Sequence, residues 1–297
     1  MPSPRAGLPG AVSIVTILVL ALAAAAGEPA ARRLQNPPAR PELFARGRIN
    51  TDADEYGPTV SPDGRELYFV RRTDRQGRER LMVAALSAAG AEAPRPLVAE
   101  DEWGDKDPYP SLDGRRLFFA SRRPLTAGGA IKDYDLWVLD RVGTRWSTPR
   151  HLGTPPNSAT YDNYPAVARN GNLYFASHRL TQRNDLFVSP WMNGAYLEPE
   201  PLSAVNTAQT DADPYVAPDE SYLIFSSDRP HGKGEGDLYI TFNRGGRWSP
   251  PRSLGDQINT ATYEYTPFIT PDGKAFFFSR DWGEIWWVST ASLNLKP

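Results

Sequence analysis

The sequence predicts an all-β fold, a β-propeller of five four-stranded blades, from three observations. A turn signal recurs five times, at intervals of 50, 57, 49 and 53 residues. A short apolar and aromatic run follows each turn, and a proline stands three residues before each turn. Self-similarity at such a period indicates a repeat architecture, in which each copy is one supersecondary unit. The five turns begin at Ser61, Ser111, Ala168, Ala217 and Thr270.

Each copy contains three clear strands and one weaker strand. The aromatic and aliphatic run after the turn favours a pleated, buried surface. Asp-Gly or Asn-Gly tolerates the positive φ of a hairpin turn, and proline is tolerated at the first residue of a strand. Four short strands repeated radially describe a propeller blade. We expect the second strands at 67–70, 117–120, 173–176, 222–225 and 276–279, and the third strands at 81–83, 136–138, 186–188, 238–240 and 285–287.

The fifth copy lacks a fourth strand, and the start of the mature chain is expected to supply it. Blades 2, 3 and 4 end with an Asn five residues before an acid, as Asn157 stands before Asp162. Asn50 stands at the same distance before Glu55. Residues 42–50 are therefore predicted to form the last strand of the last blade. This strand closes the ring and removes the exposed sheet edges of an open array. A six-bladed ring is the alternative.

Residues 1–26 are predicted to be a secretory signal peptide. Arg5 supplies a positive start, residues 11–26 an apolar core, and the alanines at its end a cleavage site. An uncleaved anchor is the competing interpretation, because sixteen apolar residues approach the roughly 20 that a bilayer helix needs. After cleavage no stable membrane span is expected, and the predicted location is periplasmic or secreted.

Two further segments follow the signal peptide. Residues 27–41 are rich in Pro, Ala and Arg and are expected to be a flexible leader. Residues 42–297 are expected to form the propeller domain, since about 256 residues suffice for one large all-β domain.

The composition excludes several functional classes. The net charge is −2 at pH 7, which gives no electrostatic case for nucleic-acid binding. No cysteine is present, so disulfides, thiolate metal sites and a cysteine nucleophile are excluded. The three histidines, His151, His178 and His231, lack metal-ligand spacing. No metal and no cofactor are therefore predicted, and a monomer is expected.

The repeats resemble the WD40-like repeats of TolB-type β-propellers. The S-P-D-G turn precedes an L-Y-F run, and S-x-R precedes a loop that ends in Asp followed by an aliphatic and an aromatic residue. The resemblance covers roughly residues 42–288. It implies a secreted or periplasmic address and a binding or scaffolding role, although TolB-type domains commonly have six blades and an added domain. The matching residues are Ser121 and Arg123 before Asp135-Leu136-Trp137, Ser177 and Arg179 before Asp185-Leu186-Phe187, and Ser227 and Arg229 before Asp237-Leu238-Tyr239.

A carboxylate stands six residues before every turn. It precedes the innermost strand, so the five acids are expected to form a ring near one mouth of the central channel. They could hold a cation or a polar ligand, or supply hydrolytic carboxylates, which stand about 5–9.5 Å apart in glycosidases. The favoured interpretation is structural: each acid accepts hydrogen bonds from its own blade-to-blade connection. The five ring acids are Glu55, Asp105, Asp162, Asp211 and Glu264.

The loops between the second and third strands are basic and are expected at the same face. Their arginines could bind an anionic peptide or glycan, because a guanidinium fork matches a carboxylate. The alternative is pairing within one loop, for example Arg123 with Asp135 or Arg229 with Asp237. The candidate ligand-binding arginines are Arg123, Arg179 and Arg229.

Together these features predict a binding or scaffold module for a protein, peptide or glycan at one propeller face, with no catalytic residue. The first alternative is a carbohydrate-active hydrolase that uses carboxylates at the channel mouth, and the second is a purely structural subunit. A hydrolase needs carboxyl groups in unequal surroundings, so that one stays protonated. Two unequal ring acids in an open pocket would therefore favour the hydrolase.

Overall fold

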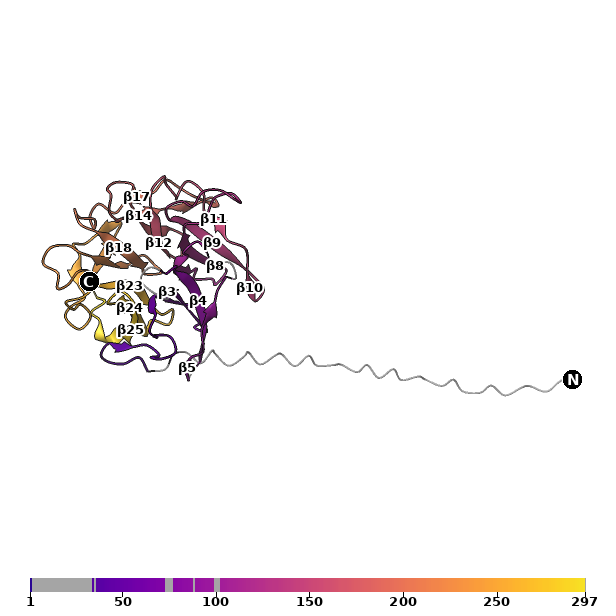
Figure 1. Cartoon of the computed structure of the whole chain (residues 1–297), viewed down its shortest axis with the longest axis horizontal. Helices are drawn as coiled ribbons and strands as arrows, with labels where there is room; N and C mark the ends of the chain where they lie inside the picture. The colour runs from indigo at the N-terminus through magenta and orange to yellow at the C-terminus, as the bar shows by residue number, and fades with distance from the viewer. Residues whose placement is uncertain (2–33, 35, 73–76, 88, 99–101, 297) are drawn as a thin grey trace. The chain divides into compact units, whose positions relative to one another are not determined.

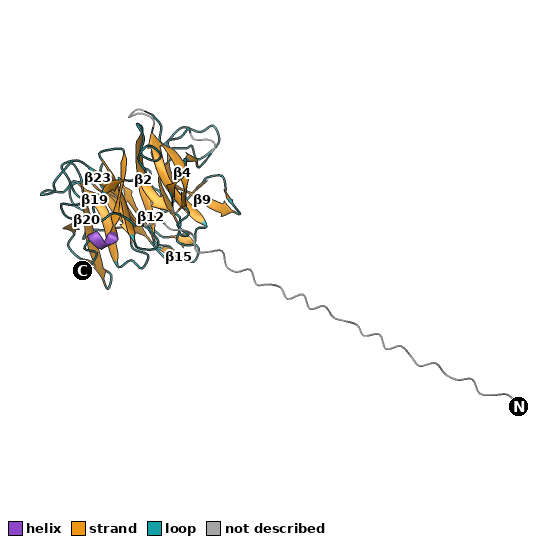
Figure 2. Cartoon of the chain, turned by 90° about the horizontal axis from the view of Figure 1, so that it is seen from below, coloured by secondary structure: helices purple, strands orange, loops and turns teal. Residues whose placement is uncertain are grey.

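The five repeats form five antiparallel sheets, which are the blades of a β-propeller (Figures 1 and 2). The computed structural model describes residues 1, 34, 36–72, 77–87, 89–98 and 102–296. The predicted signal peptide and most of the predicted leader lie outside the described residues.

Each blade has an innermost, a second and a third strand in chain order, and one or two outer strands of two residues; in blade 5 the outer strand comes from the N-terminal end of the chain. Blade 1 contains β2 (Asp54–Val60), β3 (Glu66–Arg72), β4 (Arg80–Ser87), β5 (Gly90–Ala91) and β6 (Arg95–Pro96). Blade 2 contains β7 (Lys106–Pro110), β8 (Arg116–Ser121), β9 (Asp135–Val142), β10 (Arg145–Trp146) and β11 (Arg150–His151). Blade 3 contains β12 (Asp162–Val167), β13 (Leu173–Ser177), β14 (Asp185–Ser189) and β17 (Glu200–Pro201), with a side hairpin of β15 (Trp191–Met192) and β16 (Ala195–Tyr196). Blade 4 contains β18 (Asp211–Val216), β19 (Tyr222–Ser227), β20 (Asp237–Arg244), β21 (Arg247–Trp248) and β22 (Arg252–Ser253). Blade 5 contains β23 (Glu264–Ile269), β24 (Ala275–Arg280), β25 (Glu284–Ser289) and β1 (Glu42–Leu43), and a 3₁₀ turn, η1 (Thr290–Ser292), follows it.

The aromatic runs of the second strands form the centre of each blade. One phenylalanine from each of these runs is fully buried, and each contributes about 2–3 kcal/mol by leaving water. A turn at the S-P-D-G position of the repeat precedes each run. In blade 1 the Ser61 hydroxyl donates to Asp63 at 2.6 Å, and Gly64 adopts a φ of +73°, a conformation that glycine takes without steric cost. The five phenylalanines are Phe69, Phe119, Phe175, Phe225 and Phe277.

The ring closes through the N-terminal strand, as the sequence predicted. Strand β1 pairs antiparallel with β25, with Glu42 opposite Trp287. Phe44 is buried and meets the rings of Phe277 and Trp287 edge to face, at centroid distances of 5.0 and 5.3 Å. Five blades are therefore complete, and the six-bladed alternative is wrong.

An asparagine at the end of a blade ties that blade together. The Asn50 side chain accepts a hydrogen bond from the Ile285 N–H at 2.8 Å and donates to the carbonyls of Ile285 and Phe44. Asn157 binds both backbone groups of Leu136 in the same way. An amide can donate and accept at once, which explains why asparagine recurs here. The equivalent pairs in blades 3 and 4 are Asn206 with Leu186 and Asn259 with Leu238.

Two residues of the predicted leader that the structure describes form hydrogen bonds with the C-terminal part of the chain. The Pro38 carbonyl accepts a hydrogen bond from the Ser289 N–H at 2.7 Å, and the Ala39 carbonyl accepts one from the Ser292 hydroxyl at 2.8 Å. Among the described residues, no helix is long and apolar enough to cross a membrane.

Candidate functional site

The five ring acids lie at the start of the innermost strands and are fully buried. Each forms a salt bridge with an arginine at the end of the second strand of its own blade. In the four blades whose preceding connection is described, the acid also accepts hydrogen bonds from the N–H and hydroxyl of the residue after the blade-closing asparagine. Asp162, for example, accepts both from Ser158, at 2.6 and 2.7 Å. These bonds match the structural interpretation of the ring.

The arginines complete a clamp between neighbouring blades. Arg179 donates to Asp162 and to the Pro156 carbonyl, both at 2.7 Å, and its guanidinium lies over Phe175 and Phe187. The position of the arginine depends on the length of the acidic side chain. The two glutamates pair with an arginine at the end of the second strand, and the three aspartates pair with the arginine of the S-x-R motif. The five pairs are Glu55–Arg71, Asp105–Arg123, Asp162–Arg179, Asp211–Arg229 and Glu264–Arg280.

The pairing expected within single loops is therefore wrong. Arg123 binds Asp105 rather than Asp135, which pairs with Lys132 and His151. Arg229 likewise binds Asp211 at 2.6 Å rather than Asp237. The ring acid is fully buried at the start of the innermost strand, so leaving it without a counter-charge would be costly.

The clamp gives a first prediction. Asp162→Asn keeps the size of the side chain but leaves Arg179 without a counter-charge, so the free energy of unfolding should fall by about 1–3 kcal/mol. Urea denaturation measures this loss. Arg183→Ala, which removes a more exposed arginine of the same blade, is the control and should change stability by less than about 0.5 kcal/mol. Equal midpoints for Asp162→Asn and the parent protein would contradict the clamp.

A different set of residues faces the central channel. Two positions beyond each ring acid the innermost strand contains a β-bulge, at which the register with the second strand shifts. One residue of each bulge has a positive φ, between +45° and +64°, and a proline follows it. Left-handed backbone at a residue other than glycine costs about 1–3 kcal/mol and is concentrated at functional sites. The five bulge residues are Gly57, Asp107, Tyr164, Asp213 and Thr266.

The bulge residues and their prolines enclose a hollow on the propeller axis, with an empty volume of about 320 Å³. Asp107 and Asp213 are 6 % and 3 % exposed. One oxygen of each, Oδ2, has a partner: the Tyr164 N–H at 3.3 Å from Asp107, and the Ser226 hydroxyl at 2.7 Å from Asp213. The other oxygen, Oδ1, is buried in both residues without a hydrogen-bond partner in the described part of the chain. Such oxygens are costly unless a ligand or water binds them.

The two carboxyl groups have strongly shifted acidities. Burial, together with the charge of Asp107, raises the pKa of Asp213 to about 7 against the opposing hydrogen bond from Ser226. Burial also raises the pKa of Asp107 to about 6, while the ammonium of Lys106, 3.6 Å away, lowers it. Perturbed acids in a hollow are physical markers of a functional site.

Aromatic side chains connect this hollow to the surface. Trp282 is 47 % exposed and stacks on Tyr263 at a centroid distance of 4.5 Å, and Tyr263 stacks on Tyr265 at 4.9 Å. The Tyr263 hydroxyl lies 3.5 Å from the hydroxyl of Ser226, which binds Asp213. Trp282 has a φ of +66°, which is rare for a bulky residue. We call Tyr263, Tyr265 and Trp282 the aromatic wall.

The charge around the hollow is negative. Four carboxylates, those of Asp54, Glu79, Asp107 and Asp213, lie with two cations, Arg72 and Lys106, which leaves a net charge of −2 when all are ionised. Lys106 also lies over the rings of Tyr134 and Tyr164, at 4.3 and 4.8 Å. The protein thus already holds one ammonium group against aromatic rings and a carboxylate in this region.

Sequence reasoning missed Asp107 and Asp213 because it followed the residues that repeat. The position before the conserved-spacing proline reads Gly, Asp, Tyr, Asp and Thr in the five blades. This position has the same place in every repeat but a different residue type from blade to blade, and that variation was the signal in the sequence that could have identified Asp107 and Asp213.

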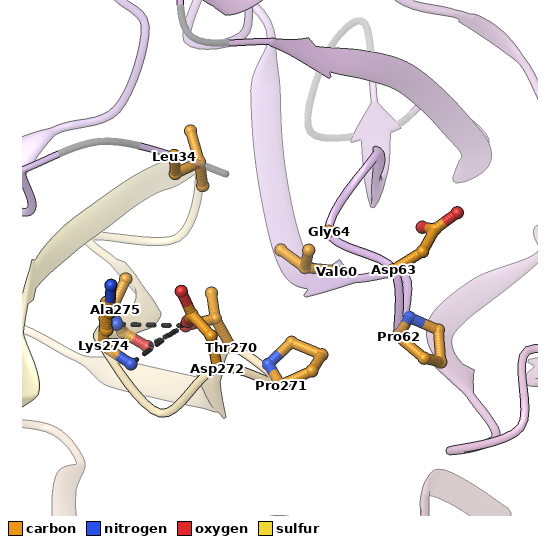
Figure 3. A pocket seen from close by; sticks show the side chains of 10 residues that line it. All are labelled: Leu34, Val60, Pro62, Asp63, Gly64, Thr270, Pro271, Asp272, Lys274 and Ala275. Atoms are coloured by element: carbon orange, nitrogen blue, oxygen red, sulfur yellow. Dashed lines mark hydrogen bonds between the residues drawn. The ribbon is translucent and has the colours of Figure 1, made fainter. Parts of the chain in front are cut away.

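A second hollow has a structural explanation. Figure 3 shows it between the turn of blade 5 and the turn of blade 1, with Leu34 at its rim. Its empty volume is about 470 Å³. The Thr270 hydroxyl accepts a hydrogen bond from the Ala275 N–H, and Asp272 accepts one from the Lys274 N–H. These polar groups build the turn itself, and Leu34 packs against the core beside it.

Comparisons with known proteins place the fold. No protein-family model and no curated protein matches the sequence. Among solved structures, the chain is similar to a putative TolB from Agrobacterium tumefaciens (TM-score 0.51, 18 % identity, 83 % of this chain and 79 % of that chain). It is also similar to TolB from Acinetobacter baumannii (0.50, 15 %, 80 % and 55 %) and to a protein of unknown function from Dyadobacter fermentans (0.50, 14 %, 84 % and 81 %). The chain thus spans about half the length of the Acinetobacter protein. These similarities show a TolB-like propeller fold.

Proposed function

We propose that the protein is an exported, periplasmic or secreted binding module that takes a lysine or arginine side chain of a protein or peptide into the mouth of its channel. The observation that carries this proposal is the pair of buried carboxylate oxygens, Oδ1 of Asp107 and Oδ1 of Asp213, that have no partner in the described structure. An ammonium or guanidinium group donates hydrogen bonds and carries a positive charge, which complements the negative charge of the two carboxylates.

The surroundings of the carboxylates fit a cation in two further ways. The net charge around the hollow, −2 when all of these groups are ionised, attracts a positive group. Trp282, the exposed end of the aromatic wall, offers a ring face, on which a cation binds with about 0.5–2 kcal/mol. Lys106 over Tyr134 and Tyr164 is an example of the same contact within the protein.

The ring acids favour binding over hydrolysis. Each is held by an arginine of its own blade, and four of them also accept the same pair of hydrogen bonds from the residue after the blade-closing asparagine. Asp107 and Asp213 are the unequal pair, and the hydrolase alternative would have to use them. Turnover of nitrophenyl glycosides that is lost in Asp107→Asn and Asp213→Asn, but kept in Asp162→Asn, would establish that alternative instead.

Calorimetric titration with short peptides tests the proposal. The probe is a hexapeptide with one central lysine, and its matched control is the same peptide with acetyl-lysine, which removes only the charge. We expect the lysine peptide to bind at least tenfold more tightly, and Asp213→Asn to weaken its binding at least tenfold. Asp162→Asn should bind as the parent does. Equal affinity for both peptides, or unchanged binding by Asp213→Asn, would overturn the proposal.

A further inference from the structure

We propose a second binding site, for a uronic-acid glycan, in a groove between the turns of blades 2 and 3. The groove has an empty volume of about 1010 Å³. We call it the arginine groove. Its defining side chains are Arg115, Arg116, Arg169, Trp191 and Tyr196.

The guanidinium groups of this groove have few direct partners. Within the described residues, the Arg115 and Arg169 side chains make no hydrogen bond or salt bridge, although Asp113 and Asp219 lie near enough to interact with them electrostatically. Arg116 has an acid, Asp140, only at 3.6 Å and in a half-exposed position. The other acid at the groove, Asp113, is turned into its own hairpin, where it accepts bonds from the Ser111 hydroxyl and the Arg115 N–H.

The aromatic floor of the groove is built rather than incidental. The Trp191 ring rests directly on Gly171, where an added Cβ would stand 2.9 Å from the indole. Trp191 also packs edge to face on Tyr196, at a centroid distance of 4.7 Å. The Arg116 guanidinium lies 5.7 Å from the centre of the indole. An aromatic surface beside guanidinium groups suits a ligand ring that has an apolar face and carries a carboxylate.

The repeat supplies an internal comparison. In the equivalent groove between blades 1 and 2, Glu66 stands where the arginine groove has Arg116, and Arg141 stands where it has Trp191. Glu66 and Arg141 form a salt bridge of 2.8 Å, and the Tyr68 hydroxyl donates to the same Glu66. That groove has an empty volume of about 540 Å³. Between blades 2 and 3 the acid is replaced by an arginine and the tyrosine by Phe118, so positive charge is left for a ligand.

A uronic-acid oligomer has two features that complement the groove. Its carboxylates fit the guanidinium forks of Arg115, Arg116 and Arg169, and the apolar face of its sugar rings fits Trp191. The site is distinct from the channel mouth, whose charge is negative, so the two proposals stand or fall separately.

Titration with oligogalacturonate tests this site. The matched control ligand is the methyl ester of the same oligomer, which keeps the sugar rings and removes the charge. We expect oligogalacturonate to bind at least tenfold more tightly than its ester. Arg116→Glu, which restores the acid of the neighbouring groove, should abolish binding, and Arg169→Ala should weaken it about fivefold. Arg247→Ala, an exposed arginine of the corresponding hairpin in blade 4, should bind as the parent does.

Three results would overturn the proposal. The ester binds as well as the acid, or Arg116→Glu binds normally, or polyglutamate binds while oligogalacturonate does not. The last result would identify the groove as a site for acidic peptides. Because Arg169→Ala lies on an exposed turn, it keeps the test valid if Arg116→Glu folds poorly.

Discussion

A chain that starts at Thr51 is expected to lose most of its stability compared with a chain that starts at Asn36. The deletion removes β1, the buried Phe44 and Ile49, and the Asn50 side chain that binds Ile285. Loss of one buried aromatic side chain alone costs about 3–5 kcal/mol, and whole domains are stable by only about 5–15 kcal/mol. Urea denaturation of the two chains measures the difference.

Asn50→Ala separates the asparagine bonds from the rest of the closing strand. It removes the bonds of this side chain to the Ile285 N–H and to the Phe44 carbonyl, while the Ile285 carbonyl keeps its bond from the Phe44 N–H, so we expect a loss of about 2–4 kcal/mol. An unfolding midpoint for the chain from Thr51 that equals that of the chain from Asn36 would show that the ring does not depend on closure.

Asp213→Asn is expected to make the protein more stable at pH 8, although it removes a buried hydrogen-bonding group. The pKa of Asp213 is raised from 3.8 to about 7, so the folded protein holds a proton that the unfolded chain releases above pH 4. The stability from this proton is complete below pH 4 and is lost as the pH rises towards and beyond 7. Three pKa units correspond to about 4 kcal/mol. Asparagine cannot ionise, so the variant avoids this loss.

Thermal unfolding from pH 4 to pH 8 measures the effect. The parent protein should lose stability across this range, whereas Asp213→Asn should be flatter and higher at pH 8 by about 1–3 kcal/mol, since its amide hydrogens gain no partner. Asp107→Asn is the comparison: it leaves Lys106 without its carboxylate, so its gain should be smaller. A parallel pH profile for parent and Asp213→Asn would mean that Asp213 is ionised at neutral pH. If Asp213→Asn gains stability and loses peptide binding, Asp213 is a functional residue that lowers the stability of the folded protein.

Several parts of the structure could be predicted because they depend on local sequence. The S-P-D-G turns and the aromatic runs after them report hairpins directly, since turn residues and strand residues act over a few positions. Asn50 could be matched to three other asparagines because its spacing to Glu55 repeats. The ring acids could be assigned a structural role because a need that recurs in every blade selects the same residue type.

Other parts could not be predicted because they depend on which side chains meet across the ring. Arg123 had two buried acids as candidate partners, and only the folded ring shows that it binds Asp105 while Asp135 pairs with Lys132 and His151. Glu66 in the groove between blades 1 and 2 corresponds to Arg116 in the arginine groove. The structure shows that Glu66 pairs with Arg141, whereas Arg116 lies over Trp191 in the equivalent place.

The fold class, the strands and the closing segment could be predicted because each follows from a pattern repeated along the chain. The location of the candidate site depends instead on how the blades come together in the closed ring. Asp107 and Asp213 lie two blades apart, and the bulges of the innermost strands turn both into one hollow on the axis. Burial in that hollow raises their pKa values and leaves one oxygen of each unpartnered, and burial of this kind is created by the closed ring rather than by any segment of the chain.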